Sequence, residues 1–161
     1  IANEAARRGT AVHKLVEQYL NNEDLSDAGV LPLALFTVMK EELDKIDNIK
    51  IQEGSLYSDE YKVAGQVDCI AEYNGELAVI DFKTAEKKKP EKWIEHYFVQ
   101  CAAYACMLYE LTGIAVKKFV IIMSCEDGDC VVYEEYDKRK YIKLLSQYIR
   151  EFVEFKLQEY A

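Results

Sequence analysis

Two periods of apolar residues alternate along this chain, and the change of period divides it into helices and strands. Apolar residues spaced by three or four positions predict helices, whereas apolar runs bounded by turn residues predict buried strands. The predicted helices cover residues 2–22, 33–46, 91–112 and a final amphipathic segment after Asp137, and the predicted strands cover residues 49–58, 61–73, 76–84, 116–125 and 130–136.

Three residues mark the ends of these helices. Pro90 favours the entry to the third helix, and Gly113 favours its end, because proline suits a first helical turn and glycine suits the residue after a last turn. Asp137 is a typical N-cap for the final helix, since its carboxylate can accept from a free backbone N–H.

The order of helices and strands predicts the fold class. The runs 61–73 and 76–84 are apolar on both faces, as expected of central strands that helices cover on both sides. We therefore predict a three-layer α/β/α fold with a central mixed sheet. We also expect residues 1–161 to form one domain. The chain starts at Ile1 rather than at a methionine, which leaves open that upstream residues are missing.

An Asn-Gly pair joins the two central strands. Asn74 and Gly75 lie between two apolar runs, which is the strongest short-range signal for a two-residue hairpin. This register sets Asp68 opposite Asp81, where Cβ atoms lie about 5 Å apart and like charges destabilise the sheet. Lys83 lies on the same face as Asp81, because side chains alternate along a strand. We therefore expect a cation between the two carboxylates.

The overall charge excludes one class of DNA-binding protein. The chain has a net charge of −9, so it is not a coat protein that binds DNA through a basic surface. A nuclease remains compatible with that charge, because acidic residues hold metal ions. No apolar run reaches the roughly 18 residues of a membrane helix, so we predict no membrane association. The five cysteines lack iron–sulfur spacing, and we expect them to be reduced thiols.

Four motifs together resemble one enzyme family. Gly65-x-x-Asp68 followed by Ile80-Asp81-Phe82-Lys83-Thr84 resembles the signature of the PD-(D/E)XK nucleases, and in particular their RecB-like branch. That branch includes phage exonucleases, CRISPR-associated exonucleases and a mitochondrial genome maintenance exonuclease. Gly9-Thr10-Ala11-Val12-His13 is similar to its upstream histidine motif, and Gln100-Cys101-Ala102-Ala103-Tyr104 is similar to its Gln-x-x-x-Tyr motif. The resemblance implies a restriction-endonuclease-like fold.

The resemblance also implies a role for each central residue. Asp68 and Asp81 would bind Mg²⁺ or Mn²⁺, which prefer oxygen ligands, together with the main-chain carbonyl of Phe82. His13 would be a further ligand, and manganese tolerates an imidazole ligand better than magnesium does. From its residue type alone, His13 is more often an ordinary core or surface histidine. Lys83 would place the attacking water or help to deprotonate it, and would stabilise charge developing on phosphorus.

Other residues are candidates for substrate contacts. Gln100 and Tyr104 lie one turn apart on one helix face, and the resemblance places that face against the nucleic-acid strand. The lysines that follow the catalytic strand can grip a phosphate backbone, although a solvated loop is the alternative; they are Lys87, Lys88 and Lys89. Trp93 and Tyr97 lie just beyond them, and packing within a helix core is favoured over stacking on bases.

Two glutamates are candidates for supporting roles. Glu17 follows His13 by one helical turn and could orient the imidazole, although a solvated charge is an equal alternative. Glu53 lies on the strand before the hairpin and could reach the metal site through a water molecule.

These features predict a metal-dependent DNA exonuclease that acts on single-stranded DNA or DNA ends. The alternatives are an endonuclease of the same fold and a non-catalytic DNA-binding scaffold. The resemblance implies phage or cellular recombination, replication or repair, a helicase or recombinase as partner, and a cytoplasmic location in a bacterial or phage-infected cell. The sequence does not define the oligomeric state.

Overall fold

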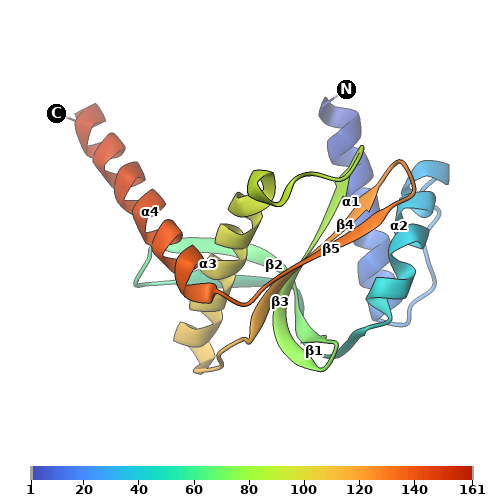
Figure 1. Ribbon diagram of the computed structural model, residues 1–161, viewed down its shortest axis with the longest axis horizontal. Helices are drawn as coiled ribbons and strands as arrows, with labels where there is room; N and C mark the ends of the chain where they lie inside the picture. The colour runs from blue at the N-terminus through green and yellow to red at the C-terminus, as the bar shows by residue number, and fades with distance from the viewer. Residues whose placement is uncertain (1, 161) are drawn as a thin grey trace.

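The computed structural model describes residues 2–160 and contains four α-helices, one 3₁₀ turn and five strands in that range (Figure 1). In chain order these are α1 (Ala2–Leu20), α2 (Val30–Leu43), β1 (Ile46–Ser58), β2 (Val63–Tyr73), β3 (Glu76–Ala85), η1 (Glu91–Ile94), α3 (Glu95–Thr112), β4 (Lys118–Cys125), β5 (Cys130–Glu135) and α4 (Lys138–Tyr160).

The five strands form one mixed sheet in the order β1-β2-β3-β4-β5. Strands β3 and β4 are parallel, and the other neighbouring pairs are antiparallel. A parallel pair needs a long crossover connection, which here contains α3. The predicted mixed sheet is therefore confirmed.

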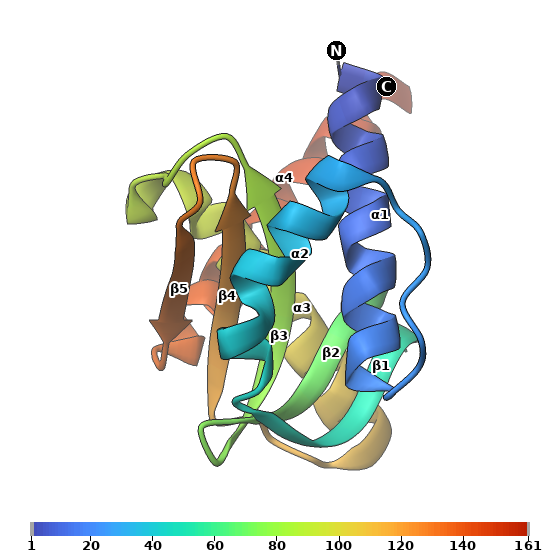
Figure 2. The same cartoon turned by 90° about the vertical axis from the view of Figure 1, so that its right-hand side faces the viewer.

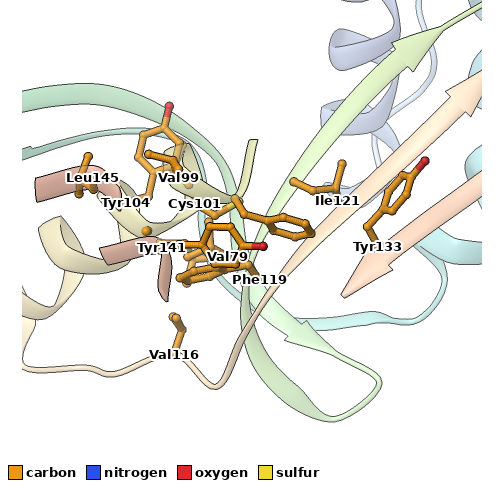
Figure 3. Packing of buried hydrophobic residues seen from close by; sticks show 14 of the residues in the cluster. Val79, Val99, Cys101, Tyr104, Val116, Phe119, Ile121, Tyr133, Tyr141 and Leu145 are labelled. Atoms are coloured by element: carbon orange, nitrogen blue, oxygen red, sulfur yellow. The ribbon is translucent and has the colours of Figure 1, made fainter. Parts of the chain in front are cut away.

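Helices cover both faces of this sheet. Helices α1 and α2 lie over one face, and α3 and α4 lie over the other (Figure 2). On the first face, Phe36 and Met39 of α2 pack with Ile80 and Ile122 of the sheet. The second face buries a larger cluster of residues from the sheet, α3 and α4, in which Tyr104 lies at the edge with its hydroxyl directed away (Figure 3). The predicted three-layer α/β/α fold is confirmed.

The predicted turn and cap residues have the expected conformations. Asn74 and Gly75 have φ angles of 51° and 83°, as a type I′ hairpin turn requires. Gly113 has φ 74° and ends α3, and its N–H donates to the carbonyl of Tyr109 over 2.8 Å. The carboxylate of Asp137 accepts from the N–H of Lys140 at the start of α4 over 3.3 Å.

Several predicted boundaries were wrong by two to four residues. Helix α2 starts at Val30 rather than at residue 33, because a proline at position 32 fits the first turn of a helix. It ends at Leu43, since β1 already begins at Ile46. The first residues of the predicted strand 61–73 belong to a turn instead, in which Lys62 has φ 56°. The segment after Pro90 starts as a 3₁₀ turn before α3 begins.

Within residues 2–160, no helix combines the length and the apolar composition that crossing a membrane requires.

Candidate active site

The β2–β3 hairpin brings the two predicted aspartates together. Its ladder pairs Tyr73 with Glu76 and continues to Cys69 with Ile80, so the next step in this register sets Asp68 beside Asp81. Oδ2 of Asp68 accepts a hydrogen bond from the N–H of Phe82 over 2.9 Å, which fixes its carboxylate at the β3 backbone. Asp68 and Asp81 are only 8% and 4% exposed, so solvent screens their repulsion poorly.

His13 reaches the same place from α1. Its Nε2 lies 2.7 Å from the main-chain carbonyl oxygen of Phe82 and 3.6 Å from Oδ2 of Asp68. Without a cation, Nε2 carries the proton that it donates to this carbonyl. The imidazole nitrogen, the carbonyl oxygen and the carboxylate oxygen thus converge from three separate parts of the chain.

Glu53 lies closer to this group than the sequence predicted. One carboxylate oxygen of Glu53, one of Asp68 and one ring nitrogen of His13 all lie within 4.8 Å of one another. In the β1–β2 register, Gln52 pairs with Cys69 and Gly54 with Val67, which sets Glu53 across from Asp68. Glu53 also has φ 48°, a left-handed conformation that is strained for a glutamate inside a strand. Such strain is often found where function fixes a side chain.

The buried Asp81 and the partly exposed Lys83 form an ion pair beside this group. The Lys83 ammonium lies 2.9 Å from Oδ2 of Asp81, but it is not aligned for a hydrogen bond, and no other residue in the range 2–160 donates to that oxygen. Burial and the neighbouring Asp68 raise the pKa of Asp81 from 3.8 to about 7. Burial acts to lower the pKa of Lys83, but Asp81 and Asp68 outweigh it, so the net direction is upward and Lys83 stays an ammonium.

A chain of polar contacts runs from Lys83 into α3. The ammonium of Lys83 lies 3.5 Å from Oε1 of Gln100, and Nε2 of Gln100 donates to the hydroxyl of Tyr104 over 3.3 Å. That hydroxyl donates in turn to the carbonyl of Gln66 over 2.9 Å. The residue before Gln66 is Gly65, and a Cβ at that position would lie 3.1 Å from the Tyr104 ring. The glycine of the motif therefore permits the close approach of β2 to Tyr104.

Tyr97 lies between β3 and the lysine loop, which is the loop of residues 86–90 that carries Lys87, Lys88 and Lys89. The Lys83 ammonium lies 4.5 Å from the centre of the Tyr97 ring, and the Lys89 ammonium lies 5.9 Å from the same point. The structure thus places Lys89 next to the site. Lys87 and Lys88 are exposed on the same loop, and no ion pair involves them within the described part of the chain.

Glu17 does not contact the imidazole of His13, so the alternative in which it orients His13 is not observed. Within residues 2–160 no hydrogen bond joins the two side chains, and the Glu17 carbonyl instead accepts from Nε2 of Gln52 over 3.0 Å. The Glu17 carboxylate is near enough to help raise the pKa of Glu53, for which burial is the larger cause. It therefore adds negative charge around the site.

These residues fit a hard divalent cation. The donor atoms are carboxylate oxygens, a main-chain carbonyl and one imidazole nitrogen, the set that Mg²⁺ and especially Mn²⁺ accept. Oδ2 of Asp81 accepts no aligned hydrogen bond within residues 2–160 and is offset by the Lys83 ammonium at 2.9 Å, so Asp81 adds negative charge beside the site that a divalent cation would also neutralise. His13, Glu53, Asp68 and the carbonyl of Phe82 would hold the ion, with Asp81 alongside.

The raised pKa of Asp81 gives a prediction for the metal-free protein. Because the folded pKa lies above the unfolded one, the folded state retains the Asp81 proton to higher pH, and stability is lost as the pH rises through about 7. In EDTA, the free energy of unfolding should therefore fall between about pH 4 and pH 7 and level off above that, and Asp81→Asn should remove much of that fall. Urea titrations at several pH values measure it. An equal fall in both proteins contradicts the assignment.

The chain belongs to the PD-(D/E)XK nuclease superfamily. The model of this family matches residues 35–160, which include both aspartates, Lys83 and Gln100, whereas His13 lies outside the matched range. A crystal structure from Eubacterium rectale, described as that of a candidate exonuclease, aligns with 94% of this chain and 66% of its own length. The TM-score is 0.64 at 11% identity, a likeness of fold alone.

Curated relatives carry nuclease names. Human mitochondrial genome maintenance exonuclease 1 is 27% identical over 162 residues, which cover 96% of this chain and 45% of the human protein. Its mouse counterpart is 34% identical over 85 residues, covering 52% of this chain and 25% of the mouse protein. An ATP-dependent helicase/nuclease from Clostridium kluyveri is 28% identical over 77% of this chain and 10% of its own length. The chain thus spans less than half the length of these relatives.

Proposed function

We propose that this chain is a divalent-metal-dependent exonuclease that hydrolyses phosphodiester bonds in DNA, with a preference for single strands or free ends. One observation carries the proposal. His13, Asp68 and the carbonyl of Phe82 converge around a single point. Lys83 lies beside this point and forms an ion pair with Oδ2 of Asp81, an oxygen that accepts no hydrogen bond within residues 2–160. The name of the human relative, which includes exonuclease, supports the preference for ends.

The residues around the site have distinct tasks in this proposal. His13, Glu53, Asp68 and the carbonyl of Phe82 would hold Mg²⁺ or Mn²⁺, which would supply Lewis acidity and make the attacking water more acidic. Lys83 remains positively charged and stabilises the charge that develops on the phosphate oxygens. Its raised pKa favours this electrostatic role over the role of a general base. Gln100 limits the positions of the Lys83 ammonium, and Tyr104 fixes Gln100 against β2.

The lysine loop is the proposed path of the DNA backbone. Lys87, Lys88 and Lys89 follow the end of β3, where the catalytic residues lie, so a strand that leaves the site can contact them. Phosphate contacts of this kind carry affinity rather than sequence preference. The proposed settings are recombination, replication and repair in a phage or a cell. The relative named as a helicase/nuclease supports a helicase as partner.

A comparison of linear and circular substrates tests the proposal. With Mg²⁺ or Mn²⁺, linear single-stranded DNA with a terminal label should be degraded to nucleotides or short products, and EDTA should stop the reaction. Covalently closed single-stranded circles of the same sequence should remain intact, because an exonuclease needs an end. Cleavage of the circles would support the endonuclease instead, and no cleavage of either substrate would support a non-catalytic scaffold.

A further inference from the structure

The single tryptophan of the chain is exposed next to the lysine loop. Trp93 lies in η1 and is 62% exposed, contrary to the expectation that it packs within a helix core. Residues 86–93 contain four lysines and two glutamates, a net charge of +2 in a chain of net charge −9. An exposed indole within a locally basic segment is a combination that folding of this domain does not require.

Contacts on both sides hold this segment in place. Ile94, the next residue, is fully buried and anchors η1 to the core. The N–H of Trp93 donates to the carbonyl of Pro90 over 2.9 Å, which closes the 3₁₀ turn. The carbonyl of Lys89 accepts from the hydroxyl of Tyr133 over 2.6 Å, which ties the loop to β5. The exposed indole therefore projects from a fixed backbone.

The same segment is joined to the catalytic centre. Lys83 and Lys89 both lie over the ring of Tyr97, at 4.5 Å and 5.9 Å from its centre. In chain order the site residue Lys83 is followed by the lysine loop and then by Trp93, and Tyr97 links the first two of these in space. A polyanion that contacts Lys83 is thus next to Lys89, and Trp93 follows Lys89 by four residues.

We propose that Trp93 stacks on an unpaired base of a single-stranded nucleic acid whose phosphates contact Lys87, Lys88 and Lys92. Stacking on an aromatic side chain needs a base with a free face, which a single strand offers and the interior of a duplex does not. The lysines contribute the electrostatic part of the affinity, and the indole makes the protein prefer single strands over duplexes. This inference rests on the proposed function and adds how the single strand is recognised.

The fluorescence of Trp93 gives a direct test, because no other tryptophan contributes to the emission. In EDTA, which prevents hydrolysis, an oligothymidylate should change the emission of the full chain in a saturable manner. A duplex with closed hairpin ends should change it much less. An independent measurement is the fluorescence anisotropy of a labelled oligothymidylate, which does not depend on the tryptophan.

Matched variants separate stacking from other effects. By anisotropy, Trp93→Ala should weaken binding about tenfold, whereas Trp93→Phe should retain most of the affinity because it keeps an aromatic face. The control is Tyr109→Ala, since Tyr109 is 61% exposed near the other end of α3 and should have no effect. Lys88→Ala should reduce the slope of log affinity against log salt concentration by about 0.7.

The outcomes distinguish this inference from the proposed function. If the wild-type chain degrades linear DNA but Trp93→Ala binds oligothymidylate as tightly as Tyr109→Ala does, stacking is wrong and the nuclease assignment stands. Equal emission changes with the closed duplex and the single strand also overturn the inference. A chain that binds DNA without any change in Trp93 emission would likewise overturn the inference, because the indole would not contact the bound strand. Absence of cleavage with every metal tested would count against the proposed function itself.

Discussion

Cleavage of DNA should fall by about a thousandfold when Lys83 is replaced by alanine, and by at least as much when Asp81 is replaced by asparagine. A positioned charge that stabilises the transition state is worth a factor of about 100 to 1,000 when it is removed. In the proposed function Lys83 is such a charge, since its ammonium lies between the carboxylate of Asp81 and the side chain of Gln100. The measurement is the initial rate of nucleotide release at saturating linear DNA with Mg²⁺.

Controls are needed because Lys83 also neutralises buried carboxylates. Its removal leaves Asp81 without a cation, which costs stability as well as activity. Asp81→Asn keeps the size of the side chain and removes the charge, so its loss of activity cannot be due to an unpaired buried carboxylate. Lys143→Ala changes an exposed lysine on α4 and should leave the rate unchanged. Circular dichroism checks that each variant is folded. A folded Lys83→Ala protein with the wild-type rate would refute the assigned role.

The hairpin of the site could be predicted from the sequence because its register is local. Asn74 and Gly75 define the turn, and counting outward from it sets Asp68 against Asp81. The same counting places Lys83 on the Asp81 face, where the ion pair at 2.9 Å is found. Alternation along a strand and a two-residue turn are short-range rules, and the strands obey them at these positions.

Glu53 could not be placed in the same way. Its position opposite Asp68 depends on the β1–β2 register, and the turn between these strands is longer and irregular, with Lys62 at φ 56°. The register also shifts between Asp47 and Ile51. A left-handed conformation at Glu53 itself follows no rule of strand alternation. A water-mediated role was therefore all that could be predicted for Glu53, whereas the structure places its carboxylate among the candidate ligands.

Tertiary contacts determine the remaining parts of the site. His13 and the carbonyl of Phe82 are 69 positions apart, and their meeting depends on how α1 packs on the sheet, which no local pattern specifies. The motif resemblance pointed to His13, although its geometry followed only from the fold. The sequence does indicate Tyr97 as a site residue. Tyr97 precedes Gln100 and Tyr104 by three and seven residues and so falls on the same helix face.

Replacing Glu53 by glutamine should weaken binding of Mn²⁺ by about a hundredfold. Even residues that only support metal ligands change affinity by about 10- to 100-fold, and Glu53 contributes a carboxylate oxygen within 4.8 Å of the His13 nitrogen and an Asp68 oxygen. His13→Ala should have a similar effect, since it removes the nitrogen that approaches the Phe82 carbonyl. Isothermal titration calorimetry with MnCl₂ measures the affinity, and Glu23→Gln, an exposed charge, is the control.

A glycine at position 53 separates metal binding from structural support. Glycine adopts a φ of 48° without strain, so Glu53→Gly should leave the stability of the metal-free protein nearly unchanged or slightly higher, although the hydrogen bond to Gln66 is lost. The same variant should bind Mn²⁺ as weakly as Glu53→Gln does. Urea unfolding in EDTA and calorimetry with MnCl₂ together test this pair of effects. A Glu53→Gly protein that retains wild-type affinity for Mn²⁺ would exclude Glu53 from the ligand set, and the strain at this position would then need another cause.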